Sequence, residues 1–413
     1  MGSIKGACTG HRRCRTGAPK MPASEYRMNP PAITLEVLPA GYGDCLLISC
    51  PVGKRTWRLL VDTGPDECWP SLRARLAEIA PGHNGKRHID LAVISHIDHD
   101  HIGGATLLFS DKSLGLTFGD VWFNAPPRPR VRGVAEGQSL ATLLGAQNTD
   151  LPWNLAFAGE SVVIPEGAFV ELPAPDGMPR ITLLSPAPSQ LANLFKVWGR
   201  ELERLRKKES EKLPPAPGLT RGVATLDPQA LAAKVTAVDR APANGSSIAF
   251  LLEHGGASVL LAADAFSTVL VPALQALARH RKQPGGVNLD AVKLSHHGSR
   301  ANVTAGFFAA VHADHYIVST NGSIFHHPDD EAIARVVVHG GRQPRLWFNY
   351  DNDRSRRWAD PALRSLHGYD VVLPEGGQSG VTLALGANQR LRSGGQVADS
   401  EPSPDSGQGR RPQ

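Results

Sequence analysis

Histidines and aspartates alternate in one short run of this chain, and their side chains bind divalent cations and move protons. The run is HIDHDH at residues 96–101, and Ile-Gly-Gly follows at residues 102–104. The apolar stretch Ile89–Ser95 precedes it and is typical of a buried strand. Burying so many carboxylates and imidazoles without a cation would be costly in free energy. The pattern therefore predicts a preformed cation site at a strand end; a polar, histidine-rich loop is the alternative.

Other predicted strands also end in, or are followed by, histidine or aspartate. In chain order, the five groups are Asp62, His96–His101, Asp264, His296–His297 and His326–His327. In layered α/β folds the strand ends on one side of a sheet gather at a common site. We therefore expect these side chains to converge, although they are far apart in the chain.

Apolar runs predict the strands and helices that must position these groups. Strands are expected at Ile33–Leu38, Asp44–Cys50, Trp57–Val61, Ile89–Ser95, Ser247–Leu252, Ser258–Ala263, Leu289–Ser295 and Tyr316–Ser319. Shorter strands are expected at Val121–Phe123, Phe169–Leu172 and Ile181–Leu184. Helices are expected at Leu72–Ile79, at Val269–Arg279 and in a segment that ends at Val338.

Composition separates a central body from two flanking segments. Residues 1–28 carry six basic residues and one acidic residue, which equals the net charge of +5 of the whole chain. The remainder is formally neutral, which argues against an extended nucleic-acid groove. Residues 1–28 are either a disordered basic arm or precede the true start at Met28, which we favour. We expect a single domain over 29–391 with an insertion at 186–244, and a disordered tail over 392–413.

The cysteine content and the apolar runs bear on localisation. The chain has five cysteines, an odd number, and its N-terminus has no apolar secretory stretch. No apolar run is long enough to span a membrane. We therefore expect reduced thiols, a cytoplasmic protein and no membrane partner.

With these motifs, the chain resembles the metallo-β-lactamase-fold hydrolases, whose hallmark after a strand is H-x-H-x-D-H. More narrowly, it resembles the soluble nuclease-like domain of competence (ComEC-type) DNA-uptake proteins. The matching segments are Gly41–Asp44, Leu60–Pro65, Ser95–Gly104, Leu183–Pro186, Leu294–Ser299 and His327–Pro328. The resemblance covers roughly residues 33–340 without the insertion. It implies an α/β fold, an αββα sandwich of two mixed β-sheets flanked by helices.

The resemblance also implies two divalent metal ions, zinc or manganese, with magnesium less favoured. Its ligands would be His96 and Asp98 for the first ion, Asp100, His101 and His296 for the second, and Asp264 as the bridge. Asp98 stands where the broad family has histidine, and a carboxylate there shifts the first site from Zn²⁺ toward Mn²⁺ or Mg²⁺. The family's further histidine before the bridging aspartate is also missing, because His254 lies at the far end of its hairpin. Asn244 or Ser247 would substitute as a weak oxygen ligand, or the first site would be loosely filled.

Further roles follow from the same resemblance. Asp100 and His327 are the expected catalytic residues, with His327 protonating a leaving oxygen or binding phosphate. Asp62 would accept a hydrogen bond that orients a ligand imidazole. The candidate substrate-binding residues are His297, Lys293, Ser299 and Asn244. A structural hydrogen bond for His297 and a solvated position for Lys293 are the alternatives.

The expected chemistry is metal-dependent hydrolysis, with a dinuclear metal-bridged hydroxide as the nucleophile. The carboxylate-rich ligand set and the His-Pro motif favour a phosphodiesterase or nuclease-like enzyme. The neutral body favours a short, single-stranded or nucleotide-sized substrate. Two alternatives remain: a lactone or thioester hydrolase of the same fold, and a metal-stabilised binding module with little turnover.

Overall fold

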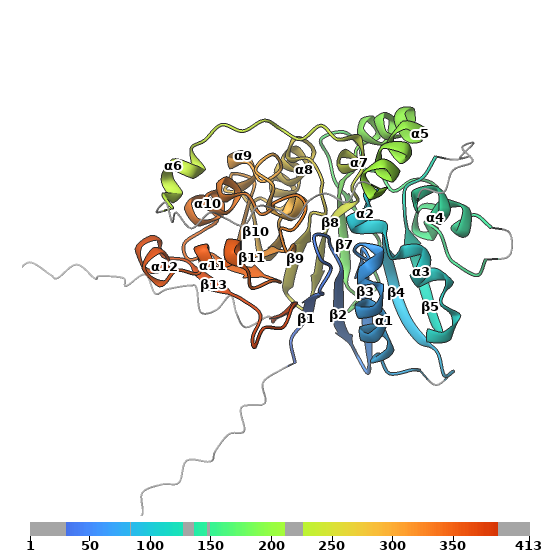
Figure 1. The fold of residues 1–413 in the computed structure, drawn as a ribbon. Coiled ribbons are helices and arrows are strands. Elements are labelled where there is room, and N and C mark those ends of the chain that lie inside the picture. Colours follow the sequence, from blue (N-terminus) through green and yellow to red (C-terminus); the bar gives the residue numbers. More distant parts are fainter. Residues whose placement is uncertain (1–29, 83, 127–135, 147–148, 211–225, 387–413) are drawn as a thin grey trace, which may run out of the picture. The chain divides into compact units, whose positions relative to one another are not determined.

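The computed structural model describes residues 30–386, except 83, 127–135, 147–148 and 211–225 (Figure 1). Contacts group the chain into residues 1–30 and residues 31–413, and the fold below is that of the second group. The expected flanking segments 1–28 and 392–413 lie outside the described residues, as does part of the expected insertion. No described helix has the length and apolar character needed to cross a membrane.

Two mixed β-sheets form the centre of the fold. The strands are β1 (Ile33–Val37), β2 (Leu46–Val52), β3 (Arg55–Val61), β4 (Arg87–Val93), β5 (Leu116–Trp122), β6 (Val170–Glu171), β7 (Arg180–Ser185), β8 (Ala249–His254), β9 (Ala257–Leu261), β10 (Val287–Lys293), β11 (Val311–Val318), β12 (Arg345–Phe348), β13 (Asp370–Val372) and β14 (Val381–Leu385). The first sheet has the order β14-β1-β2-β3-β4-β5, and the second β13-β12-β11-β10-β9-β8-β7-β6. Parallel and antiparallel pairs occur in both sheets.

Helices cover the two sheets (Figure 1). They are α1 (Trp69–Ala77), α2 (His99–Ile102), α3 (Ala105–Ser110), α4 (Glu136–Leu144), α5 (Pro188–Ser210), α6 (Pro228–Ala232), α7 (Pro242–Gly245), α8 (Ser267–His280), α9 (Ala305–Phe308), α10 (Asp330–His339), α11 (Asp353–Trp358) and α12 (Pro361–His367). This arrangement confirms the expected α/β sandwich of two mixed sheets flanked by helices.

The alternation of side chains along β2 shows how the first sheet is buried on both faces. Leu46 and Ile48 belong to the core cluster that includes strands of the second sheet. Leu47, between them, belongs to a separate cluster with Leu72 and Leu76 of α1. Because successive strand residues point to opposite faces, one face of the sheet packs on the second sheet and the other on helices. The first sheet is therefore held rigidly between two apolar layers.

The sequence expectations hold best where apolar runs are long. Each of the eight longer expected strands overlaps an observed one. The elements after Gly340, from β12 to β14, were not expected. They include β14, which pairs antiparallel with β1 and so forms the edge of the first sheet. Only 121–123 was expected of β5, because its first five residues are half-exposed and lack a strong apolar pattern.

Parallel strands bring the polar groups to one side of the molecule. In the first sheet β3 and β4 run parallel, and Asp62 follows β3 directly while His96 follows β4 by three residues. In the second sheet β9 and β10 run parallel, and Asp264 follows β9 while a tight 3₁₀ turn, Ser295–Gly298, follows β10. Both sheets therefore deliver their histidines and aspartates from the carboxyl ends of parallel strands.

A close backbone approach makes Gly43 a sensitive position. A Cβ atom on Gly43 would lie 1.9 Å from the carbonyl oxygen of Asp100, which accepts a hydrogen bond from the amide of Asp44 at 3.0 Å. Gly43→Ala must push this turn away from α2, and we expect it to lower the free energy of unfolding by about 1–3 kcal/mol. Chemical unfolding in the presence of a chelator measures this loss. Gly285→Ala is the matched control, because its added methyl meets nothing within 4 Å; equal losses in the two variants would contradict the explanation.

Candidate metal centre

Asp264 stands at the centre of the converging residues, and its two carboxylate oxygens face different imidazoles. Its Oδ2 lies 3.9 Å from His96 Nε2 and 3.6 Å from His296 Nε2. Its Oδ1 lies 3.3 Å from His101 Nε2 and 3.9 Å from His297 Nε2. Each oxygen of this carboxylate thus faces a different pair of imidazole nitrogens, and His96 and His101 of the two pairs are neighbours, with ring centroids 4.2 Å apart.

Two further carboxylates complete the two groups. Asp98 Oδ2 lies 4.0 Å from His96 Nε2. Asp100 Oδ2 lies 3.1 Å from His297 Nε2 and 3.9 Å from His101 Nε2, and these two nitrogens are 3.2 Å apart. We call the group of His96, Asp98, His296 and Asp264 Oδ2 the first half-site. The group of Asp100, His101, His297 and Asp264 Oδ1 is the second half-site.

The structure places the adjacent histidines His296 and His297 differently from the sequence expectation. His297, expected to contact substrate, lies in the second half-site where His296 was expected. His296 lies beside His96, in the half-site for which the sequence offered too few ligands. Both residues have left-handed backbone conformations, with φ of 50° and 54°. Such a turn directs successive side chains in ways that a strand-like reading of the sequence cannot anticipate.

Hydrogen bonds fix the protonation of two imidazoles in the first sheet. The carboxylate of Asp62 accepts hydrogen bonds from the amide of Ser95 at 2.7 Å and from its hydroxyl at 2.8 Å. It also lies 2.8 Å from His101 Nδ1, which must therefore donate. His96 Nδ1 lies 3.0 Å from the Ser95 hydroxyl oxygen, whose own hydrogen is used on Asp62. Both imidazoles therefore carry hydrogen on Nδ1, and in the neutral form each presents a lone pair at Nε2.

The two histidines of the second sheet are fixed in the same way. His297 Nδ1 lies 2.8 Å from the carbonyl oxygen of Ser319, which can only accept. His296 Nδ1 lies 3.1 Å from Asn302 Oδ1. The amide of Asn302 is itself oriented, because its Nδ2 donates to the carbonyl oxygen of Asp264 at 3.1 Å. In their neutral forms, all four imidazoles therefore direct an Nε2 lone pair toward the carboxylates.

This arrangement fits divalent cations. Lone pairs that face carboxylate oxygens at 3.3–3.9 Å repel one another unless positive charge lies between them. The side chains of His96, His101 and His297 are fully buried, and water cannot relieve the contact. His96 Nε2 and Asp264 Oδ1 are buried and have no hydrogen-bond partner among the described residues. The residues present therefore form a donor set of the kind that binds divalent metal ions.

The pKa values show the same need for positive charge. Burial would lower the pKa of His101, but Asp264 and other carboxylates raise it well above its usual value. Burial also acts against a charged His297, yet Asp44 and Asp264 raise its pKa to about 9. For His96, burial is decisive and lowers the pKa to about 3. In metal-free protein, protons on the second half-site therefore balance its carboxylates.

A buried ion pair lies beneath the second half-site. The ammonium of Lys293 is bonded to Asp44 Oδ2, and both side chains are almost completely buried. Asp44 Oδ1 lies 3.3 Å from His297 Nδ1. Burial would raise the pKa of Asp44, but the charge of Lys293 holds it well below its usual range. Lys293 was expected to contact substrate. Its side chain instead points into the protein, where its ammonium pairs with the carboxylate of Asp44.

The structure also places the remaining candidates. Ser299 is 4% exposed, and its hydroxyl accepts a hydrogen bond from a backbone amide of its own turn rather than facing the centre. Asn244 is buried and donates to Asp239 Oδ2 at 2.7 Å. Asn244 Oδ1 and Ser247 Oγ are buried without a hydrogen-bond partner in the described chain. His254 ends β8 and contacts a backbone carbonyl, far along the hairpin from Asp264 as expected.

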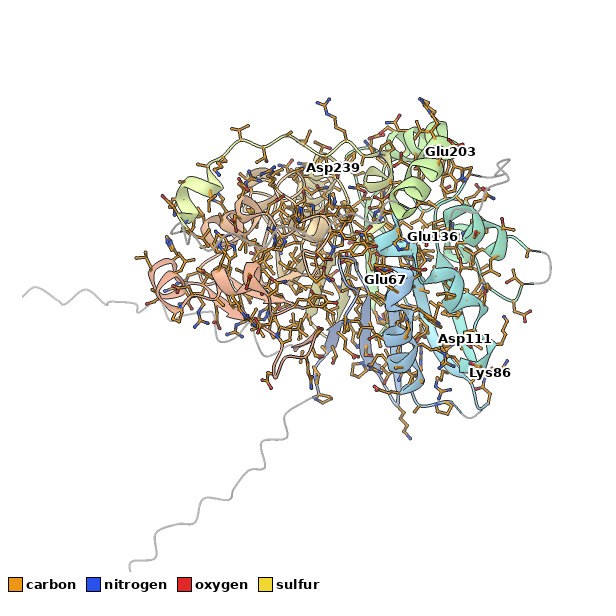
Figure 2. The ribbon with its side chains drawn as sticks, viewed as in Figure 1. Glu67, Lys86, Asp111, Glu136, Glu203 and Asp239 are labelled. Carbon is orange, nitrogen blue, oxygen red and sulfur yellow. The ribbon has the colours of Figure 1, made fainter. Side chains whose placement is uncertain are left out.

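Two histidines border the centre without joining either half-site. The ring of His327 lies 5.0 Å from the ring of His296, and its Nδ1 is 3.5 Å from Asp329 Oδ2. Its side chain is 12% exposed, so it lies at the rim. His99 begins α2, and its Nδ1 is 2.9 Å from a carboxylate oxygen of Glu136 at the start of α4 (Figure 2).

Sequence reasoning missed several residues that hold the imidazoles. The groups that contact Nδ1 atoms are Asp239, Asn302 and the carbonyl of Ser319. Asp239 and Asn302 were missed because they lie in loops, which have no periodic apolar pattern. Only Asp44 had a sequence signal, its place in the segment Gly41–Asp44 that matches the family pattern.

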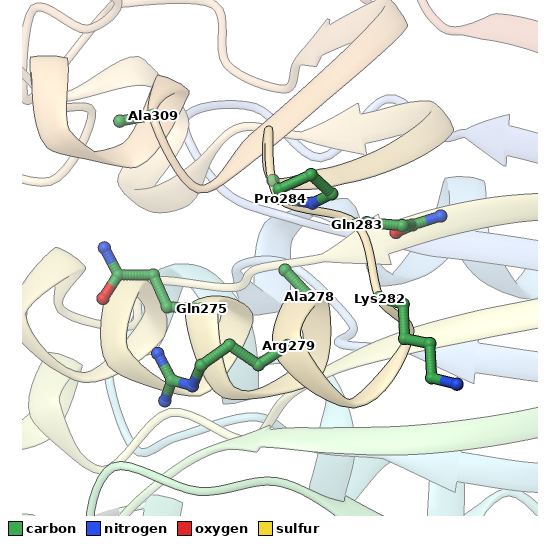
Figure 3. Close-up of a pocket in the computed structure, with 8 residues that line it drawn as sticks. Gln275, Ala278, Arg279, Lys282, Gln283, Pro284 and Ala309 are labelled. Atoms are coloured by element: carbon green, nitrogen blue, oxygen red, sulfur yellow. The ribbon is translucent and has the colours of Figure 1, made fainter.

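A cavity of about 510 Å³ lies away from these residues (Figure 3). Its walls come from the end of α8 and the loop that follows, together with Ala309. The lining residues are Gln275, Ala278, Arg279, Lys282, Gln283, Pro284, Gly286 and Ala309. They include no histidine, cysteine or carboxylate, so this cavity offers no comparable metal chemistry.

The buried ion pair gives a test of what supports the second half-site. Lys293→Met removes the ammonium that is the main counter-charge of the buried Asp44, and we expect it to lower the free energy of unfolding by about 3–5 kcal/mol. Adding Asp44→Asn removes the uncompensated charge and should restore much of this loss. Unfolding is measured in chelator, so that metal binding does not contribute. A double variant as unstable as Lys293→Met would contradict this role of the pair.

Metal binding should release protons at pH 7. In metal-free protein the raised pKa values of His101 and His297 keep both imidazoles protonated at this pH. A metal ion binds the neutral form, so its apparent affinity should rise as the pH rises from 6.5 toward 9. Calorimetric titration with Mn²⁺ in two buffers of different ionisation enthalpy counts the released protons. Binding heat that is the same in both buffers would contradict the prediction.

Comparison with solved structures found two chains that align with most of this one. The metallo-beta-lactamase fold protein YhfI from Bacillus subtilis aligns with 85% of this chain and 99% of its own, with a TM-score of 0.39 and 12% identity. A new diphosphatase from the PhnP family aligns with 85% of this chain and 97% of its own, with a TM-score of 0.35 and 12% identity. No protein-family model and no curated protein matches the chain.

Proposed function

We propose that this protein is a metal-dependent hydrolase that cleaves phosphodiesters with two divalent cations, one in each half-site. The observation that carries the proposal is the division of four Nε2 lone pairs between the two oxygens of Asp264. A carboxylate that faces two separate donor groups in this way is suited to bridge two ions. The likeness of residues 95–104 and 294–299 to competence-type nuclease-like domains also supports it.

The donor set favours hydrolysis over a purely structural role. A structural zinc site is closed by four ligands around one ion, whereas these residues form two groups that share one carboxylate. Two ions bound there would acidify water and stabilise the negative charge that develops on phosphate oxygens. Asp98, Asp100 and Asp264 contribute oxygen ligands to this set, which makes Mn²⁺ as suitable as Zn²⁺.

His327 is placed to exchange a proton at the rim of the centre. Burial lowers its pKa, so the imidazole is neutral in the free protein at pH 7. Its Nδ1 faces Asp329, which leaves Nε2 to hold or release the reacting proton. The negative charge of a bound phosphodiester would raise this pKa and favour the protonated form, from which the leaving oxygen takes its proton.

Two observations favour a small substrate with a planar group. Residues outside the basic segment 1–28 are formally neutral, which does not suit long polyanions. Phe325, two residues before His327, is 36% exposed and packs edge-on against Tyr42 at 5.7 Å. Exposed aromatic rings of this kind stack on nucleobases, so a nucleotide or short single strand fits the rim.

The proposal is tested with metal-stripped protein, bis-p-nitrophenyl phosphate and a short labelled single-stranded DNA. Adding back Mn²⁺, Zn²⁺ and Mg²⁺ in turn should restore cleavage with at least one of the first two. Asp264→Ala combined with His101→Ala should reduce the rate to that of metal-free protein, because both half-sites lose a ligand. Asp176→Ala combined with His88→Ala changes the same residue types at exposed positions and serves as the matched control.

Other outcomes would point to the alternatives. Wild-type protein that binds two ions but cleaves neither substrate would exclude the phosphodiesterase, and lactone and thioester substrates would be tested next. A single tightly held zinc ion without turnover would indicate a metal-stabilised binding module.

A further inference from the structure

We propose that Asp239 is a positioning residue that holds the His296 imidazole in the first half-site, so that the first ion depends on it and the second does not. The inference rests on the proposed two-ion centre. It assigns a role to the segment between α6 and α7, on which Asp239 lies (Figure 2).

Several donors converge on one oxygen of Asp239. Its Oδ2 lies 3.3 Å from His296 Nδ1 and accepts hydrogen bonds from Asn244 Nδ2 at 2.7 Å and Asn302 Nδ2 at 3.2 Å. Its other oxygen accepts from the amide of Ala241 at 2.9 Å. Only an ionised carboxylate offers acceptors on both sides, and an amide at this position would turn an NH₂ group toward other donors. The network therefore needs the charge of Asp239 and not only its shape.

The segment that carries Asp239 is fixed to the protein by a buried arginine. Arg335 is 3% exposed and donates to the carbonyl of Lys234 at 2.7 Å and the hydroxyl of Thr236 at 3.1 Å. The same guanidinium donates to the carbonyls of Arg300 and Val303, both at 2.8 Å. It thus joins the segment before Asp239 to the turn that contains Asn302. Both groups that hold His296 Nδ1 are anchored to one side chain.

His296 depends on such support more than the other imidazoles. Its side chain is 21% exposed, whereas those of His96, His101 and His297 are fully buried. Apolar packing therefore restricts its ring less, and hydrogen bonds at Nδ1 must set the direction of Nε2. Partners of this kind orient ligand imidazoles and typically change metal affinity by about 10–100-fold when removed.

The test compares metal binding in Asp239→Asn with wild-type protein, using calorimetric or chelator-competition titration with Zn²⁺. We expect one of the two ions to bind about 10–100-fold more weakly and the other to keep its affinity. His296→Ala should weaken the same ion. In the double variant, Asp239→Asn should add nothing to His296→Ala, because the residue it positions is gone.

Asp227→Asn is the matched control, because it makes the same change at an exposed helix cap, at the start of α6. Thermal unfolding in chelator establishes that each variant is folded. Should Asp239→Asn fail to fold, Asp239→Glu keeps the charge, displaces it by one methylene and must weaken only the same ion. Wild-type affinity for both ions in the folded Asp239 variant, or equal weakening of both, would overturn the inference. Wild-type protein that binds two ions without cleaving phosphodiesters would overturn the proposed reaction and leave this role of Asp239 intact.

Discussion

The centre depends on one electrostatic constraint: four imidazoles donate their Nδ1 hydrogens to surrounding acceptors, and their Nε2 atoms, which carry lone pairs in the neutral form, face carboxylates. The acceptors are Asp62, the hydroxyl of Ser95, the carbonyl of Ser319 and the Asn302–Asp239 pair. Neutral groups cannot satisfy such a cluster, and burial excludes water from most of it. Positive charge must come from protons or from metal ions, and the donor types favour metal ions.

Both sheets contribute residues to this cluster of imidazoles and carboxylates. The first sheet supplies His96 and the short helix with Asp100 and His101, while the second supplies Asp264 and the histidine pair. The Lys293–Asp44 ion pair joins the sheets beneath the second half-site, because Asp44 precedes β2 and Lys293 ends β10. The rigidity of the two apolar layers thus extends to the ligands. The first half-site is more exposed to solvent, because the His296 side chain is 21% exposed. Its geometry depends on the segment between α6 and α7 that carries Asp239.

The sequence predicted that the histidines and aspartates at the strand ends converge, but not which of them belongs to which half-site. Buried parallel strands have strong apolar patterns, so their ends, and the residues that follow them, could be located. Which of His296 and His297 faces which oxygen of Asp264 depends on a left-handed turn that has no sequence signature here. The burial of Lys293 depends on Asp44, almost 250 positions away, and the role of Asp239 depends on a segment fixed by Arg335. These long-range contacts carry no local periodicity.

The central claim is that Asp264 lies between two cation sites. Anomalous diffraction from crystals soaked with Mn²⁺ or Zn²⁺ tests it most directly, because the signal locates each ion without assumptions about activity. We expect two peaks, one between Asp264 Oδ2 and the Nε2 atoms of His96 and His296, the other between Oδ1 and those of His101 and His297. A single peak, or no peak beside Asp264, would contradict it.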